Sequence, residues 1–320
     1  MTESMVHTVA VVGTGVIGRS WAQLFARKGC ETRLYDRDPE QLAKAVSWID
    51  EDLEHRTVEG EFAADVVAAM RSRISLHDSL HLAVQGADYV QESGPEQLEV
   101  KQALYRELDM AAAPAAILAS STSALDMTAI AEGLEGAGRC IVAHPTNPPH
   151  VIPVVEILPG KGTTDDVLRQ TCTFMKRIGQ TPVVLSEYVP GFLLNRMQAA
   201  LIREAMSLVQ RGVADVDAID AVIRDGLGLR WALMGPFGVG DTNADGGVRD
   251  YFTGYRDAYL ALMDDLGETP GIDDEFVEHL GVKTDLMQGG APRAEVLAWR
   301  DRMVEKIRRL KAEDPNPGRE

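Results

Sequence analysis

The chain has 320 residues, enough for about two domains, and its hydrophobic fraction of 45% and charged fraction of 25% are ordinary for a globular protein. Its net charge of −17 argues against nucleic acid and anionic membranes as partners, because phosphate groups are bound by basic patches. No apolar run approaches the roughly 18 residues of a membrane span, and we expect no signal peptide before the first strand. Three cysteines without a C-x-x-C pair indicate reduced, buried thiols and a cytoplasmic protein: Cys30, Cys140 and Cys172.

The first half of the chain alternates short apolar runs with helical patterns. Such alternation predicts right-handed crossovers and a mostly parallel sheet. The predicted strands are Thr8–Val12, Thr32–Tyr35, Ile74–Leu76, Tyr89–Gln91, Ile117–Ala119, Cys140–Ala143 and Val183–Leu185. The predicted helices between them are Val16–Lys28, Pro39–Glu54, Glu61–Met70 and Glu96–Met110.

After residue 185 the pattern changes, and no convincing strand follows. The predicted helices are Phe192–Arg211, Val216–Asp225, Val248–Leu266, Asp274–Leu280 and Arg293–Lys311. We therefore predict an α/β protein with two domains. Residues 1–187 form a Rossmann-type, doubly wound, mostly parallel sheet, and residues 188–320 form an all-helical domain.

A glycine-rich segment, G-T-G-V-I-G, joins the first strand to the first helix and is followed eighteen positions later by Asp36. In this context G-x-G-x-x-G predicts a dinucleotide site, with the pyrophosphate at the helix N-terminus. Asp36 would hydrogen-bond the ribose and repel a 2′-phosphate, which favours NAD over NADP, although the adjacent Arg37 could accept that phosphate. The alternative is a glycine-rich turn without a ligand. The predicted cofactor contacts are Gly13, Gly15, Val16, Ile17, Gly18 and Asp36.

His144 lies where a short apolar run breaks into prolines, and Glu156 closes a second apolar run, Val151–Val155, on the adjoining strand. An imidazole suits proton transfer at neutral pH, and a carboxylate can orient it and stabilise its charged form. A proton acceptor beside a hydride acceptor is the equipment of an alcohol dehydrogenase. A histidine at a strand end is more often structural, so both interpretations stay open.

Two further polar positions are candidates. Ser123 follows a predicted strand at the sheet edge where ligands bind, or it caps the next helix. Asn195 begins the long helix of the second domain, where it contacts substrate or makes an interdomain hydrogen bond. His77 and His81 have a spacing that suits metal ligands on a helix face, but without a third ligand a solvated face is favoured. We predict no metal site.

These segments together resemble the 3-hydroxyacyl-CoA dehydrogenase superfamily over nearly the whole chain, and within it the lambda-crystallin / L-gulonate 3-dehydrogenase branch. The matching segments include V-V-G-T-G-V-I-G-R-S-W-A-Q-L-F-A, P-E-Q-L-E-V-K, S-S-T-S, I-V-A-H-P-T-N-P-P, V-V-E-I-L-P, G-F-L-L-N-R and G-L-G-L-R-W-A-L-M-G-P. The H-P-x-N-P-P form separates this branch from the acyl-CoA enzymes. The resemblance implies an NAD-binding domain followed by a helical dimerisation domain, and therefore a homodimer.

The resemblance also implies roles for single residues. His144 is the catalytic base with Glu156 as its partner, while Ser123 and Asn195 contact the substrate. Two further residues, Glu96 and Lys101, match positions that contact the cofactor. Asn147 has a supporting role near the substrate. Arg230 is a plausible clamp for a substrate carboxylate, because guanidinium binds carboxylates bidentately, or else it forms a surface ion pair.

The implied reaction is NAD-dependent oxidation of the 3-hydroxyl of a small hydroxy acid, with L-gulonate as the leading candidate. Departures at His150, where relatives carry tyrosine, and in the segment 235–247 put L-gulonate itself in doubt. The alternatives are a short-chain 3-hydroxyacyl-CoA, a betaine such as L-carnitine, and a crystallin-like structural protein that binds the dinucleotide without turnover. The intact set of Ser123, His144, Glu156 and Asn195 argues against the last of these.

Overall fold

The computed structural model describes residues 6–267 and 269–314, and these fall into two compact units that divide after Arg196. The first unit is an α/β domain and the second, called here the helical unit, begins at Met197. Between them runs one long helix, α8 (Leu194–Gln210), whose first turn belongs to the α/β domain. The two-part organisation predicted from the sequence therefore has its division inside this helix.

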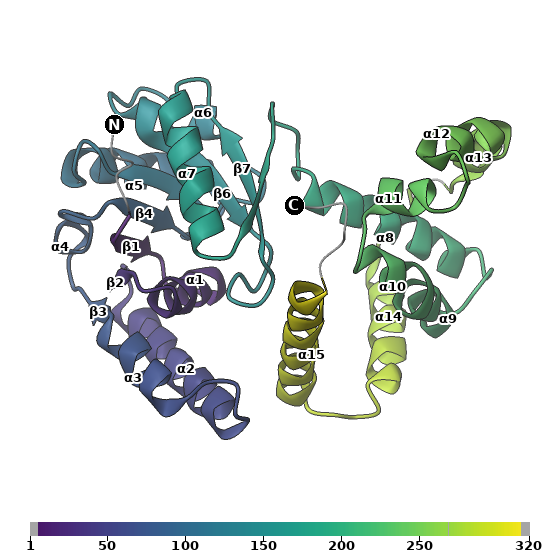
Figure 1. Cartoon of the computed structure of the whole chain (residues 1–320), viewed down its shortest axis with the longest axis horizontal. Coiled ribbons are helices and arrows are strands. Elements are labelled where there is room, and N and C mark those ends of the chain that lie inside the picture. The colour runs from purple at the N-terminus through teal and green to yellow at the C-terminus, as the bar shows by residue number, and fades with distance from the viewer. Residues whose placement is uncertain (1–5, 268, 315–320) are drawn as a thin grey trace. The chain divides into compact units, whose positions relative to one another are not determined.

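The α/β domain is built on one eight-stranded sheet with the strand order β3-β2-β1-β4-β5-β6-β7-β8 (Figure 1). All neighbouring strands are parallel except the antiparallel pair β6 and β7. The order reverses between β1 and β4, and the crevice at such a switch point is where open α/β sheets bind ligands. The strands are β1 (Thr8–Val12), β2 (Glu31–Tyr35), β3 (Ile74–Leu76), β4 (Tyr89–Glu92), β5 (Ile117–Ser120), β6 (Cys140–Pro145), β7 (Val154–Pro159) and β8 (Thr181–Val184).

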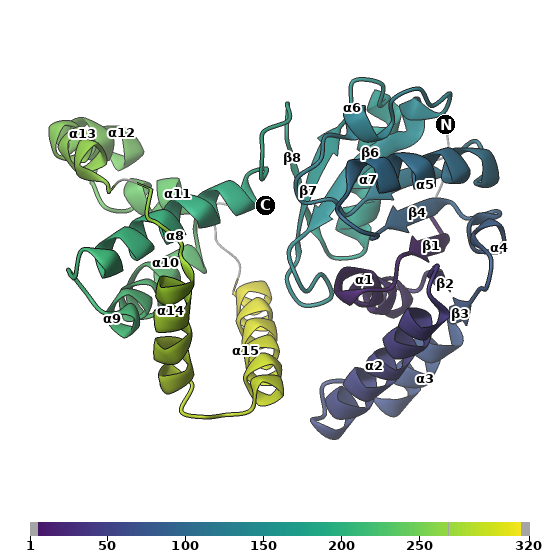
Figure 2. The same ribbon diagram turned by 180° about the vertical axis from the view of Figure 1, so that it is seen from behind.

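Helices cover both faces of the sheet and produce two separate hydrophobic cores. On one face Trp21 and Phe25 of α1 pack with Phe174 of α7, and on the other Tyr105 and Leu108 of α5 pack against the opposite sides of the strands. The two views show α7 in front of the sheet in Figure 1 and α5 in front in Figure 2. The helices are α1 (Val16–Arg27), α2 (Pro39–Val58), α3 (Ala64–Ser72), α4 (Leu80–Val84), α5 (Leu98–Ala111), α6 (Met127–Ile130) and α7 (Asp165–Arg177), with a 3-10 turn at Ala137–Arg139.

Three local expectations were wrong. The helix predicted to begin at Glu96 is α5, and it begins at Leu98. Gln97 is its extended N-cap residue, and the carboxylate of Glu96 bonds to another loop. Strand β7 begins at Val154, since Val151 lies in a turn that bonds back to Pro148, and Glu156 is inside the strand. His77 follows β3 and only His81 lies in α4, so the two histidines do not share a helix face.

The helical unit contains no strand among its described residues, as predicted. The predicted helix 248–266 is divided at Tyr255 into two helices, and the predicted helix 216–225 continues as a π-helical turn, Val222–Leu227. Within residues 6–267 and 269–314, no helix combines the length and the apolar character needed to cross a membrane. The helices are α9 (Val216–Ala221), α10 (Gly228–Trp231), α11 (Pro236–Asp241), α12 (Gly247–Gly254), α13 (Arg256–Asp265), α14 (Asp274–Met287) and α15 (Arg293–Glu313).

Candidate active site

The turn between β1 and α1 has the form that a dinucleotide phosphate needs. Gly13 has φ +90°, and a Cβ there would lie 2.8 Å from the backbone of Ser93. A Cβ at Gly18 would collide with the carbonyl oxygen of Gly13, so both positions require glycine. Beside Gly15 the space is open, and no side chain caps α1 there, which leaves N–H groups of the first turn, from Val16 and Ile17 onward, for a ligand.

Asp36 lies at the end of β2 and is held against this glycine turn. Its Oδ2 accepts hydrogen bonds from Thr14 N at 2.7 Å and from Thr14 Oγ1 at 3.0 Å, and its Oδ1 accepts one from Asp38 N at 3.0 Å. These donors fix a carboxylate beside the turn, where it can accept hydrogen bonds from the ribose hydroxyls of the dinucleotide and would repel a 2′-phosphate on that ribose.

His144 and Glu156 face each other across the antiparallel strands β6 and β7. Nδ1 of His144 lies 2.8 Å from Oε2 of Glu156, and the two residues are only 7% and 2% exposed. An ionised carboxylate only accepts hydrogen bonds, so the imidazole proton lies on Nδ1 and the lone pair on Nε2. The arrangement is a base–orienter pair whose reactive nitrogen is Nε2.

The other carboxylate oxygen of Glu156 accepts the backbone N–H groups of Leu193 and Leu194 at 2.8 and 2.9 Å. The chain reaches this geometry through two consecutive left-handed residues, Gly191 (φ +76°) and the fully buried Phe192 (φ +50°). A left-handed phenylalanine costs about 1–3 kcal/mol, which is typical of functional sites. Burial alone would raise the pKa of the Glu156 carboxyl, but the bonds from His144 and from these backbone N–H groups lower it.

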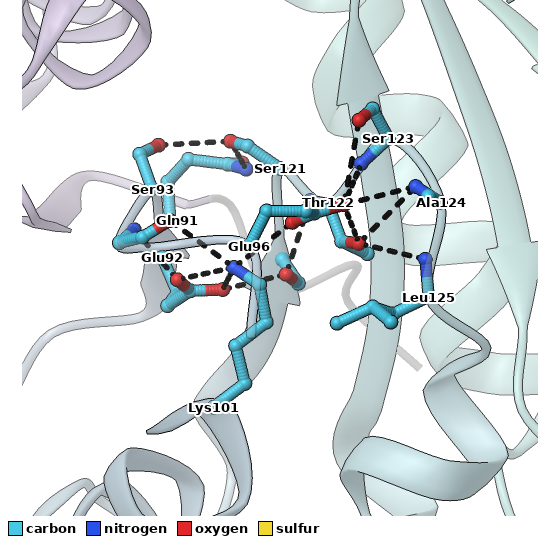
Figure 3. Close-up of polar contacts among 12 residues, drawn as sticks. Gln91, Glu92, Ser93, Glu96, Lys101, Ser121, Thr122, Ser123, Ala124 and Leu125 are labelled. Atoms are coloured by element: carbon cyan, nitrogen blue, oxygen red, sulfur yellow. Dashed lines mark hydrogen bonds and ion pairs between the residues drawn. The ribbon is translucent and has the colours of Figure 1, made fainter. Parts of the chain in front are cut away.

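The S-S-T-S loop after β5 is organised by one carboxylate, that of Glu96 (Figure 3). Its Oε1 accepts from Thr122 Oγ1 at 2.6 Å, from Ser123 N at 2.8 Å and from Ala124 N at 2.9 Å. The Ser123 hydroxyl is further away, at 3.3 Å, and is therefore the donor most easily turned towards a substrate. Burial raises the pKa of Glu96, yet the Thr122 bond, Lys101 and the two backbone bonds lower it overall.

Beneath this loop lies a buried ion pair between Lys101 and Glu92. Nζ of Lys101 is 2.8 and 2.9 Å from the two carboxylate oxygens of Glu92, and the side chains are 1% and 0% exposed. The same Nζ lies 3.6 Å from Glu96, and Ser120 Oγ donates to Glu92 at 2.5 Å. The ammonium therefore joins the end of β4 to the carboxylate that holds the Ser123 loop (Figure 3).

Parallel pairing brings the Ser123 loop beside His144, since β5 and β6 are neighbours in register Ser120–Val142 and both residues follow at the carboxyl edge. Asn195 is half-buried in the first turn of α8, next to the Leu194 N–H that Glu156 binds. Asn147 is exposed in the loop after β6. Five of the predicted site residues thus lie on adjacent segments of one domain: Ser123, His144, Asn147, Glu156 and Asn195.

The departure at His150 and the predicted clamp residue Arg230 have different surroundings. His150 is buried, and its ring packs edge-on against Trp48 of α2 at a centroid distance of 5.8 Å. Arg230 is exposed on α10 in the helical unit. In the described part of the chain, no group of three or more histidine, cysteine, aspartate or glutamate residues could hold a metal ion.

Sequence reasoning missed several buried and half-buried polar residues at this edge. Glu92 is the last residue of β4, one position beyond the predicted strand Tyr89–Gln91. A carboxylate at the end of such a run was a usable signal, because a buried charge requires a partner. The hydrogen-bonded group of Trp21, Gln91, Ser93 and Ser121 had no such signal, since its members are far apart in the sequence.

Comparison with known proteins agrees with this architecture. The family model of the 3-hydroxyacyl-CoA dehydrogenase NAD binding domain matches residues 8–188, and the model of the family's C-terminal domain matches residues 191–283. The chain belongs to the 3-hydroxyacyl-CoA dehydrogenase family. It is therefore an NAD-dependent oxidoreductase, and the predicted fold class, cofactor and enzyme class are confirmed.

Proteins similar to this chain carry different names, and those that name a substrate do not agree on it. A lambda-crystallin homolog of Bos taurus is 37% identical over 310 residues, 96% of each chain. An L-carnitine dehydrogenase of Streptomyces coelicolor is 34% identical over 307 residues, covering 95% of this chain and 94% of the relative. The structure of an NAD-dependent 5-dehydrogenase of a formyl-hydroxy-methylpyridine carboxylic acid superposes with TM-score 0.79 at 27% identity, covering 96% of this chain and 98% of the other. The family is thus fixed, while the names differ in substrate.

Proposed function

We propose that the protein oxidises the 3-hydroxyl of a small, free hydroxy acid to the 3-keto acid, with L-gulonate as the leading candidate. The observation that carries this proposal is the buried His144–Glu156 pair at the edge of a dinucleotide-binding sheet. Similarity to a lambda-crystallin homolog over 96% of the chain supports the choice of branch.

The chemistry assigned to each side chain follows from its contacts. Nε2 of His144 takes the proton of the substrate hydroxyl, and Glu156 stabilises the imidazolium that forms. The Ser123 hydroxyl donates to the substrate oxygen, and Asn195 orients the reacting carbon. Bound NAD supplies the hydride acceptor. The glycine turn, Asp36 and the segment around Glu96 would hold that cofactor.

The surroundings of the cations near residues 50–80 favour a free acid over a coenzyme A ester. A coenzyme A substrate carries phosphates, which proteins bind with arginine or lysine. Here Arg56 is buried in ion pairs with Asp52 at 2.7 Å and Glu61 at 3.0 Å. Arg71 bonds Asp50 at 2.6 Å, and Arg73 donates to a backbone carbonyl of α1. The arginines of this region are therefore engaged within the domain.

A betaine such as L-carnitine is a second candidate substrate. Similarity to an L-carnitine dehydrogenase over 95% of the chain supports including this substrate in the test.

The test is initial NADH formation with L-gulonate, L-3-hydroxybutyrate, L-carnitine and 3-hydroxybutyryl-CoA, each with NAD and with NADP. We expect the highest kcat/KM with L-gulonate or another free hydroxy acid and NAD. Preference for 3-hydroxybutyryl-CoA would overturn the proposed substrate class while leaving the roles of His144 and Glu156 intact. No turnover with any substrate, despite NADH binding, would indicate a crystallin-like protein.

Arg230 is proposed as the clamp for the substrate carboxylate, because it is exposed and charged on α10. Arg230→Met should raise the KM for the acid by about tenfold or more, with NADH affinity unchanged. An unchanged KM would rule out the clamp.

We also propose a cytoplasmic homodimer. Its support is the exposure of large apolar side chains on the last helices of the helical unit, including Trp299 at 55% and Leu310 at 62%. Contiguous exposed apolar surface commonly marks an interface between chains. The three free cysteines suit a reducing compartment, and burial raises the pKa of Cys140 to about 12, although Cys172 is only partly buried. Light scattering should give the mass of a dimer, and a monomer mass would overturn the homodimer.

A further inference from the structure

Four side chains between the glycine turn and the S-S-T-S loop form a directed hydrogen-bond chain that the proposed function does not use. Ser121 Oγ lies 3.2 Å from Trp21 Nε1, 2.7 Å from Gln91 Nε2 and 2.9 Å from Ser93 Oγ. Figure 3 shows Ser121 with Gln91 and Ser93. A hydroxyl has one proton and two lone pairs, so the direction of each of these bonds can be assigned.

The two nitrogen partners of Ser121 are both donors. The indole of Trp21 can only donate. The amide of Gln91 is oriented because its nitrogen also faces the carbonyl of Ala143 at 3.4 Å, while its oxygen accepts from Tyr89 Oη at 3.2 Å. Both lone pairs of Ser121 are therefore occupied, and its proton is donated to Ser93. The Ser93 hydroxyl consequently accepts from Ser121, and its own proton is directed elsewhere.

Ser93 lies at the switch point of the sheet, the place where sheets of this kind bind dinucleotides. It follows β4 directly, at the switch point with β1, and its N–H donates to Val12 O at 2.7 Å. The backbone of Ser93 packs directly against Gly13, because a Cβ added at Gly13 would lie only 2.8 Å from it. The next residue is fixed as well, because Gly94 N donates to Glu92 at 2.6 Å. The Ser93 side chain is only half-buried and thus accessible to a ligand.

We propose that Ser93 donates a hydrogen bond to an oxygen of the pyrophosphate–ribose segment of the dinucleotide, and that Ser121 acts as the positioning residue that directs this proton. A phosphate or ribose oxygen is the acceptor that this crevice brings next to the glycine turn. The buried Trp21 and Gln91 hold Ser121 in place, so the direction of the Ser93 proton is set before the ligand binds.

The test is equilibrium binding without any hydroxy acid, so it is independent of the proposed substrate. NADH, ADP-ribose and AMP are titrated against the wild type, Ser93→Ala, Ser93→Thr, Ser121→Ala and the double variant. As the matched control, Ser72→Ala removes an exposed serine hydroxyl of α3. We expect Ser93→Ala to weaken NADH and ADP-ribose binding about three- to tenfold and to leave AMP binding unchanged, because AMP lacks the pyrophosphate.

Ser93→Thr should restore most of the affinity, since it keeps the hydroxyl. Ser121→Ala should lose less affinity than Ser93→Ala, and the double variant should bind no more weakly than Ser93→Ala alone, because Ser121 acts only through Ser93. Wild-type affinity for NADH in Ser93→Ala would overturn the proposal. An equal loss for AMP would overturn it too, since that result means a displaced glycine turn.

Discussion

His144 and Glu156 occupy directly opposed positions on β6 and β7, with 2.8 Å between Nδ1 and Oε2. The same carboxylate holds two backbone N–H groups at the start of α8. Glu156 therefore holds the imidazole of His144 and also fixes the segment that carries Asn195, so one side chain connects the proposed base with the first turn of the helix that is proposed to contact the substrate.

Replacement of His144 separates chemistry from cofactor binding. His144→Ala should lower kcat by about 10²- to 10⁴-fold, the usual contribution of a general base, because alanine has no ring nitrogen that could accept the substrate proton. NADH affinity, measured by fluorescence titration, should remain at the wild-type value. A variant with near-normal kcat would remove His144 from the mechanism.

The ionised form of Glu156 stabilises the fold in a defined pH range. Its pKa is lowered from the ordinary value of 4.5, so its contribution is complete above that pH and is lost as the pH falls through the lower folded-state pKa. Glu156→Gln should reduce the free energy of unfolding at pH 7, and the difference from wild type should shrink below pH 4.5. Urea unfolding at both pH values measures this, with Glu99→Gln on the exposed face of α5 as the control. A difference independent of pH would contradict it.

The Lys101–Glu92 pair predicts a large loss of stability. Lys101→Met leaves the carboxylate of Glu92 buried without its cation, which typically costs about 3–5 kcal/mol. Lys44→Met breaks an exposed pair with Glu40 at 3.9 Å and should cost about 0–1 kcal/mol. Denaturant midpoints compare the two variants. If Lys101→Met lost no more stability than Lys44→Met, the buried ion pair would not stabilise the end of β4.

Glu96 should control kcat through the Ser123 loop. Glu96→Ala removes the common acceptor of three close donors, and we expect kcat to fall about tenfold to a hundredfold because the Ser123 hydroxyl is displaced. All of these donors use Oε1 alone, so Glu96→Gln keeps an acceptor there and should retain most of the rate. Steady-state kinetics with Glu99→Ala as the control tests this, and equal losses in both Glu96 variants would argue against positioning.

Asp36 should determine the preference between NAD and NADP. Its carboxylate is held beside the glycine turn by Thr14, where it repels a 2′-phosphate. Asp36→Ala should weaken NAD binding and reduce the ratio of the NAD and NADP kcat/KM values by about tenfold or more, with Arg37 available to the added phosphate. An unchanged ratio would assign cofactor selection to another residue.

The sequence by itself determined most strands of the sheet, the helices that follow the first strands, the glycine turn, and the two residues proposed as the proton-transfer pair. These features depend on short-range periodicity, on turn chemistry and on motifs, which are readable along the chain. The local pattern was insufficient at Glu96. The helical pattern includes this residue, but its carboxylate accepts hydrogen bonds from donors 26 to 28 positions away, and α5 begins after it.

Only the tertiary structure decided which polar groups meet. The opposition of His144 and Glu156 depends on the β6–β7 register, and the burial of Lys101 depends on the distant end of β4. The direction of the Ser93 proton depends on Trp21, which lies 100 positions from Ser121. Such contacts are set by sheet order and packing of both faces, and a hydrogen bond requires atoms within about 3 Å, a condition that no spacing along a chain specifies.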